Sequence, residues 1–321
     1  LDPENLKAHL GVAAVYLQLD DLILASEHAN AAIAINNKAI AAFFVLADIA
    51  AKEGRTQSVE NLYLNAQSKT EGYLKYELLV ADRLVKFYAE QKQPEKSLKL
   101  AEDITKRYPY DSTALAFQAR IQLSYNKTTE AIQTLEKLVH KDKKDSYHRL
   151  QLVKLLYKQP GNEQQILTLL QETSELLPNN AEVIIQTTIY QTQQKKFSDA
   201  LASAKKVQQL VPDSGKAEVL EGNIYLGQKK FDLALATFKK SYQINANTEV
   251  MNLITNILVA QSKHAEATQF LGQQLNNPPE NILVEHPDNT IVLNNLAWLY
   301  HLKNDPRAVE LAAKAYQKAP K

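Results

Sequence analysis

Apolar and small residues recur along this chain at the spacing of one face of an α-helix. The pattern is clearest in the 34-residue stretch 215–248, which contains Gly222, Tyr225, Phe231, Ala234 and Phe238. These positions predict two amphipathic helices joined by a short turn, each with one buried face. Gly222 has no side chain, so we expect the first helix to approach a neighbour closely at this point.

The same pattern repeats with a period close to 34 residues. The twentieth position of successive units holds Ala25, Val59, Ser97, Ala131, Ile166, Ala200, Ala234, Ala267 and Ala308. The aromatic residue of the first helix recurs as Tyr16, Tyr88, Tyr157, Tyr225 and Tyr300, and helix-ending prolines recur as Pro3, Pro109, Pro178, Pro212, Pro287 and Pro320. A fixed period of this length indicates a solenoid in which helix pairs stack on one another.

These columns resemble the tetratricopeptide repeat. That family places a small residue at position eight, aromatics at eleven and twenty-four, Ala at twenty and often Pro at thirty-two. The stretch 215–248 matches four of these five positions, and Ala246 replaces the proline. The resemblance implies an all-α solenoid, a right-handed superhelix of about nine helix-turn-helix repeats.

We expect one solenoid over residues 1–321, with repeats near 6–39, 40–73, 78–111, 112–145, 147–180, 181–214, 215–248, 248–275 and 289–320 and an insertion at 276–288. The stretch 1–5 looks like the end of a preceding repeat, so the chain is expected to be a fragment of a longer protein. Extra residues at 74–77 predict a lengthened helix or loop before the third repeat.

The fifth repeat, 147–180, is the least regular. Lys154 occupies the eighth position, where a small residue is usual, and Pro160 and Gly161 replace the ordinary turn between the helices. Proline ends a helix because it lacks an amide hydrogen and its ring clashes with the preceding turn. We therefore expect this repeat to be a weak joint in which Lys154 interrupts the packing.

Composition agrees with continuous helix and excludes several functions. The chain has 8 glycines and 11 prolines, and 45% of its residues are hydrophobic. A formal charge of +1, from 37 basic and 36 acidic residues, gives no field for binding nucleic acid. The absence of cysteine excludes disulfides and thiolate metal sites. The apolar run at 40–51 contains Asp48, so we interpret it as a buried repeat helix and not as a membrane span.

The sequence offers little for catalysis. Its seven histidines show no metal-ligand spacing, and HExxH, P-loop, GxGxxG and GxSxG motifs are missing. Glu285 and His286 are the one local pair suited to acid–base chemistry, but no nucleophile stands near them in the sequence. We therefore predict no catalytic residues, no metal and no cofactor, and we interpret this pair as part of a surface loop.

Protein recognition is what the resemblance implies. In this family the first helices line a concave groove through positions two, five, nine, twelve and thirteen. The aligned residues are Asp48, Asp82, Lys86, Arg120, Gln151, Ile185, Ile189, Asn223, Asn252, Asn256, Asn294 and Trp298. The family's set of residues that clamps a C-terminal carboxylate is not reproduced here.

Seven of these residues form the predicted protein-binding groove, namely Ile185, Ile189, Asn223, Asn252, Asn256, Asn294 and Trp298. A side-chain amide both donates and accepts hydrogen bonds, so a row of asparagines could hold the backbone of an extended segment. Trp298 would supply an apolar anchor. The alternative is that the asparagines are merely solvated and Trp298 is packing. The sequence does not name the partner or the oligomeric state.

The C-terminal string IVLNNLAWLYHLKNDPRAVELAAKAYQKAP, residues 291–320, resembles the PEP-CTERM system TPR-repeat lipoprotein of bacteria. The resemblance implies a scaffold for exopolysaccharide export and protein sorting, facing the periplasm or envelope, with a membrane anchor outside this fragment. A periplasmic scaffold of alginate or cellulose secretion and a cytosolic adaptor are the alternatives. Exposed aromatics such as Trp298 would also be needed if glycan were bound.

Overall fold

The computed structural model describes residues 4–276 and 290–318. Within these two ranges the chain forms eighteen α-helices and one 3-10 turn, and it contains no β-strand. Helices adjacent in sequence pack against one another in pairs, so the predicted all-α helical-repeat fold is confirmed. Contacts divide the chain into two compact units, Leu1–Leu156 and Tyr157–Lys321, and each is described on its own.

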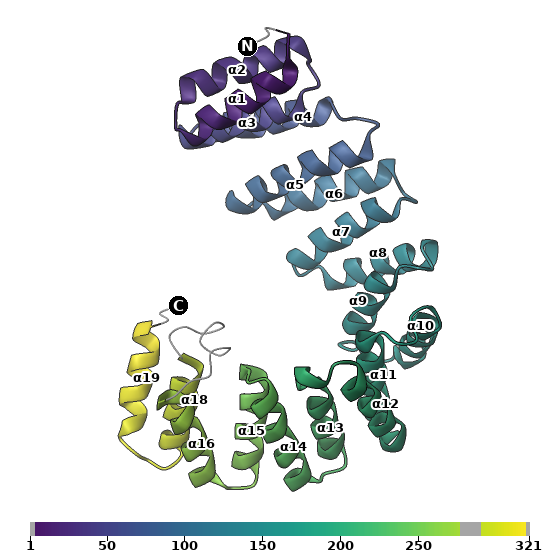
Figure 1. Ribbon diagram of the computed structural model, residues 1–321, viewed down its shortest axis with the longest axis vertical. Helices are drawn as coiled ribbons and strands as arrows, with labels where there is room; N and C mark the ends of the chain where they lie inside the picture. Colours follow the sequence, from purple (N-terminus) through teal and green to yellow (C-terminus); the bar gives the residue numbers. More distant parts are fainter. Residues whose placement is uncertain (1–3, 277–289, 319–321) are drawn as a thin grey trace. The chain divides into compact units, whose positions relative to one another are not determined.

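The described part of unit 1 contains nine helices, drawn in purple to teal in Figure 1. They are α1 (Leu6–Gln18), α2 (Leu22–Ile35), α3 (Ile40–Lys52), α4 (Thr56–Ser68), α5 (Leu74–Glu90), α6 (Pro94–Arg107), α7 (Ser112–Ser124), α8 (Thr128–Lys141) and α9 (Ser146–Leu156). Each helix from α2 to α8 packs between its two neighbours in sequence.

Unit 2 continues the pattern. Its described elements are α10 (Glu163–Leu176), α11 (Ala181–Gln193), α12 (Phe197–Leu210), η1 (Pro212–Ser214), α13 (Lys216–Gly227), α14 (Phe231–Ile244), α15 (Thr248–Ala260), α16 (His264–Asn276), α18 (Thr290–His301) and α19 (Arg307–Lys318). The helices α16 and α18 pack together although the stretch between them lies outside the described residues.

The division between the units falls at Leu156 and Tyr157, inside the predicted fifth repeat. Here α9 packs on α8 in unit 1, while α10 packs on α11 in unit 2. The expectation that Lys154 interrupts the packing stays a prediction: its side chain is exposed, while Leu152 and Val153 beside it are buried.

Other expectations remain predictions. The repeat boundaries, the single solenoid and the right-handed superhelix are among them. The predicted insertion at 276–288 lies outside the described residues except for Asn276, as does the pair Glu285 and His286.

A shared backbone turn joins the helices of eight pairs. One residue in each adopts a left-handed conformation with positive φ, namely Asp20, Gly54, Lys92, Asn126, Lys195, Lys229, Ser262 and Asn304. The next residue then donates its amide hydrogen to a carbonyl five residues back, for example from Lys230 to Tyr225 at 2.8 Å. This bond satisfies a carbonyl that the end of the helix would leave unpaired.

The residues at the twentieth position of the repeats, which we call the buried column, lie in the core. Its members from Ala25 to Ala267 are all buried, and Ala308 is half-buried. Gly222 of α13 faces the ring of Phe238 of α14, and a methyl group built on Gly222 would lie 2.6 Å from that ring. Phe238 is fully buried. Gly222 therefore sets the close approach of these two helices, as the sequence predicted.

The extra residues at 74–77 extend α5 at its start, and they bring a buried carboxylate into the structure. Glu77 is 1% exposed. Its carboxylate accepts hydrogen bonds from the Tyr108 hydroxyl at 2.6 Å, the Arg107 guanidinium at 2.5 Å and the Gly72 amide at 2.9 Å. Burial acts to raise the pKa of Glu77, but these hydrogen bonds outweigh it and hold the pKa below its usual value.

The close approach at Gly222 predicts opposite effects for two glycine-to-alanine substitutions. Gly222→Ala should destabilise the protein by about 1–3 kcal/mol, because the new methyl group overlaps the Phe238 ring. Gly11→Ala is the matched control, since Gly11 is also helical and, apart from its own helix backbone, nothing in the described chain lies within 4 Å of the new methyl group. It should stabilise the protein by about 0.5–1 kcal/mol. Urea unfolding of both variants tests this, and equal effects would contradict it.

The network around Glu77 predicts a dependence on pH. At pH 7, Glu77→Gln should cost about 1–3 kcal/mol, because Arg107 and Tyr108 lose their carboxylate partner. The folded-state pKa lies below the usual value of about 4.3, so this contribution is complete above that pH. It is lost as the pH falls through the folded-state pKa. The stability difference between the two proteins, measured by urea unfolding from pH 7 to pH 3, should therefore narrow in acid. A constant difference would show that folding does not change the pKa of Glu77, and it would contradict this account.

Candidate binding surface on the first helices

Within each unit, the first helices of several successive pairs lie side by side. Contacts join α1 to α3 and α5 to α7 in unit 1, and α11 to α13 in unit 2. We call the surface that these helices share within one unit the first-helix face. In unit 2 it comprises α11, α13, α15 and α18, drawn in green to yellow in Figure 1.

In unit 1 this face is charged, and its charges pair across neighbouring helices. Asp48 of α3 lies 3.8 Å from Arg83 of α5, and Asp82 of α5 pairs with Arg120 of α7. All four side chains are at least two-fifths exposed, so each pair contributes about 0–1 kcal/mol. Asp48, Asp82 and Arg120 are among the residues that the sequence aligned with groove positions. Because they pair with other side chains of this face, their charges are less available to a binding partner.

A recess of about 360 Å³ opens beside Asp48, between α3, α4 and α5. Tyr63, Arg83, Lys86 and Glu90 also line it. Burial raises the pKa of Asp48, while Arg83 and Lys86 act to lower it. Burial likewise raises the pKa of the Tyr63 hydroxyl, and the Asp48 charge adds to this effect. The recess therefore holds a mixed set of charges that largely balance one another.

In unit 2 the first-helix face carries amides instead of charges. Asn223, Asn256 and Asn294 are exposed, and the described part of the chain supplies no hydrogen-bond partner for their side chains. Asn252 is half-buried and accepts a hydrogen bond from Asn295 at 2.8 Å. This bond ties α15 to α18. Sequence reasoning missed Asn295, because the repeat alignment selected the neighbouring Asn294.

Trp298 stands one helical turn after Asn294 on α18. Its side chain is 47% exposed, so roughly half of the ring system stays available for contact. Leu302, a further turn along, is 46% exposed. Sequence reasoning did not select Leu302, although it occupies the thirteenth position of its unit when Thr290 is counted as the first. The two side chains place apolar surface beside the amides.

The two predicted isoleucines behave differently from the asparagines. Ile185 and Ile189 of α11 are half-buried and pack against the core formed by Ala200, Ala204 and Val207 of α12 with residues of α13. They contribute more to packing between helices than to an open surface. The structure thus gathers the exposed members of the predicted groove on α13, α15 and α18.

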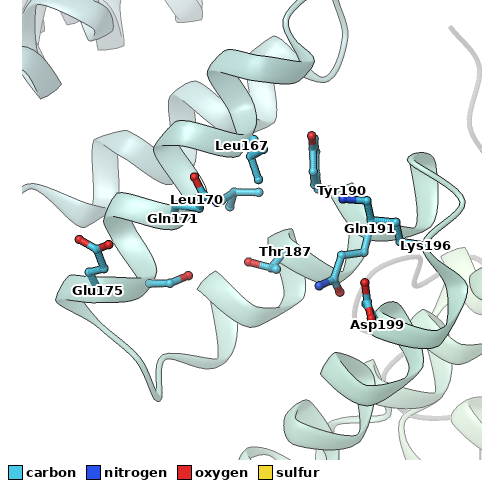
Figure 2. A pocket seen from close by; sticks show the side chains of 10 residues that line it. Leu167, Leu170, Gln171, Glu175, Thr187, Tyr190, Gln191, Lys196 and Asp199 are labelled. Atoms are coloured by element: carbon cyan, nitrogen blue, oxygen red, sulfur yellow. The ribbon is translucent and has the colours of Figure 1, made fainter.

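A second recess lies in unit 2 between α10, α11 and the start of α12 (Figure 2). Its volume is about 480 Å³. Leu167, Leu170 and Tyr190 provide its apolar lining, and its polar lining consists of Gln171, Ser174, Glu175, Thr187, Gln191, Lys196 and Asp199. No feature of the sequence pattern signalled it, because it depends on how α10 sits against α11.

Two histidines far apart in sequence also meet. The Nδ1 atoms of His9 and His28 lie 2.9 Å apart, and the Tyr16 ring stacks on His28. Across the described ranges there is no group of three or more His, Cys, Asp or Glu residues that could hold a metal ion. None of the described helices combines the length and the hydropathy needed to cross a membrane.

Comparison with known proteins gives similarity of fold only. No protein-family model matches the chain, and no curated protein sequence does. Among solved structures, a tetratricopeptide repeat protein from Parabacteroides merdae is 20% identical, with a TM-score of 0.46 over 79% of this chain and 98% of that one. YrrB, described as a TPR protein with an unusual peptide-binding site, is 17% identical, with a TM-score of 0.47 over 62% of this chain and 97% of its own.

A third structure, the APC/C hetero-tetramer Cut9–Hcn1, is 14% identical with a TM-score of 0.48. That match covers 93% of this chain and 57% of the solved one. The fold of the present chain is established by its own helix pairs, its buried column and its recurring left-handed turn. Together these features define an all-α helical-repeat protein.

Proposed function

We propose that this chain is a non-catalytic protein-binding scaffold, and that the first-helix face of unit 2 holds an extended segment of a partner protein. One observation carries the proposal. Asn223, Asn256 and Asn294 project unpaired amides from three first helices, and the half-exposed Trp298 lies one turn from Asn294. Amides unused by the fold are available to a partner.

The chemistry of this face suits a peptide backbone. Each asparagine amide can donate to a carbonyl and accept from an amide hydrogen of the partner, with little regard to the partner's side chains. Trp298 and Leu302 offer apolar surface on which one large side chain of the partner can pack. Aromatic anchors of this kind commonly carry most of the binding energy of an interface. Unit 1 is less suited, since Asp82 and Arg120 already pair with each other.

For the cellular role we propose a scaffold of the bacterial envelope that serves exopolysaccharide export and PEP-CTERM protein sorting. The support is the resemblance of residues 291–320 to the lipoprotein of that system. The partner would be an envelope protein. Fractionation of the full-length protein in its source bacterium tests this. Recovery in the cytosol would favour the alternative of a cytosolic adaptor.

The binding surface is tested with a double substitution, Asn256→Ala with Asn294→Ala. Both side chains are exposed, so the circular dichroism and melting curve should stay unchanged. Capture of the partner recovered from the native envelope should weaken about tenfold or more, a loss of about 1.4 kcal/mol. Unchanged capture by the folded double variant would place the site elsewhere.

The matched control is Gln243→Ala with Gln269→Ala. These two amides are exposed on the second helices α14 and α16, away from the first-helix face. The control should leave capture unchanged. If it weakened capture as much as the asparagine variant, the effect would come from general loss of surface amides and the proposed surface would be wrong.

A further inference from the structure

The recess between α10, α11 and α12 has no role in the binding surface just described. We infer that it is a second peptide site, which takes an apolar residue next to a lysine or arginine in an extended segment. The argument rests on a buried polar atom without a partner, on the charges around the recess and on its apolar lining. It does not depend on the proposed function of the first-helix face.

The buried polar atom belongs to Gln191. Its side-chain oxygen is inaccessible to solvent, and the described part of the chain offers it no hydrogen-bond donor. If the amide were turned around, its nitrogen would occupy the same place, so a polar atom is buried there in either orientation. An unpaired buried polar group costs stability. By contrast, the buried Gln186 on the same helix has a hydrogen-bond partner, because its amide nitrogen donates to the Glu182 carboxylate at 3.0 Å.

Other polar side chains around the recess also lack partners among the described residues. Gln171, Ser174, Glu175, Lys196 and Asp199 form no side-chain hydrogen bond or ion pair with any described residue. Figure 2 shows Glu175 at one end of the recess, and Gln191, Lys196 and Asp199 at the other. Such an arrangement, apolar in the middle and polar at both ends, is typical of ligand sites.

The lining selects the chemistry of the ligand. Two carboxylates and one ammonium group give the recess a net charge of −1, so a cationic ligand is favoured over an anion. Leu167, Leu170 and Tyr190 can cover one apolar side chain. Gln191 borders the recess, and its amide oxygen can meet a hydrogen-bond donor once the side chain turns toward a ligand. Lys196 needs an acceptor, and one peptide unit provides both groups. An apolar residue followed by a basic residue therefore matches all three features, with the basic group directed to Glu175.

This site is separate from the first-helix face. On α11 the recess is lined by Thr187, Tyr190 and Gln191, whereas Ile185 and Ile189 are the residues that align with groove positions. Successive residues on a helix are about 100° apart, so these sets project in different directions. The chain would then engage two peptide segments at once.

The first test is Gln191→Met, which keeps the size of the side chain and removes its polar end. In the free protein this should raise the melting temperature by about 2 °C or more, since an unpaired buried polar group is removed. A lowered melting temperature would show that Gln191 supports the fold, and it would overturn the assignment. Gln193→Met, at an exposed position on the same helix, is the control and should leave the melting temperature unchanged.

The second test measures binding by nuclear magnetic resonance titration of the unmodified chain. The probes are two acetylated and amidated pentapeptides, each with a central leucine followed by either lysine or glutamate. The lysine peptide should bind saturably with a dissociation constant of about 1 mM or lower and shift the signals of α10 and α11. The glutamate peptide should bind at least tenfold more weakly. Equal binding of both, or no binding, would overturn the proposal.

Two variants complete the test. Gln191→Met should weaken the lysine peptide about tenfold although the free protein is more stable, a combination that a structural role would not give. Glu175→Gln should weaken it about threefold or more by removing the charge that faces the basic group. Glu163→Gln, also exposed on α10, changes the net charge equally and should have no effect. A loss shared by both glutamate variants would show a general charge effect and no defined site.

Discussion

Close contact between paired helices is the constraint on which the rest of this structure depends. A single helix pair cannot bury its apolar face alone, so its core comes from the partner helix and from the neighbouring pair. The ring of Phe238 reaches its place only because Gly222 has no side chain, and the buried alanines of the other pairs allow similar approaches. Stability is then close to a sum over pairs and their interfaces, with few contacts between distant parts of the sequence.

This arrangement also decides which residues are left for binding. Small and aromatic side chains are used in the core, so the first-helix face is free to carry polar residues. In unit 1 it carries ion pairs such as Asp82 with Arg120, which satisfy one another. In unit 2 it carries exposed amides such as Asn256 and Asn294, beside Trp298. The same scaffold thus presents one surface that is internally satisfied and one that is open to a partner.

The periodicity of the sequence predicted those features of the fold that arise from regular packing of helices. The helix pairs, the buried column and the close approach at Gly222 all follow from spacing along the chain. It could not predict features set by the contact of particular side chains, such as the bond of Asn252 to Asn295, the burial of Glu77 or the unpaired Gln191. The left-handed turns could not be predicted from the sequence either, because residues such as Lys229 adopt a conformation usually associated with glycine. Among the predicted groove residues, spacing alone did not separate the exposed asparagines from the half-buried Ile185.

Native-state hydrogen exchange tests most directly the claim that stability resides in closely packed pairs. The pair α13 and α14 contains the Gly222 contact, whereas the division between the two compact units falls between α9 and α10. Amides of α13 and α14 should therefore be protected more than those of α9 and α10 by about tenfold or more, or about 1.4 kcal/mol of opening free energy. Equal protection of all four helices would contradict the account, because the chain would then open as one cooperative unit.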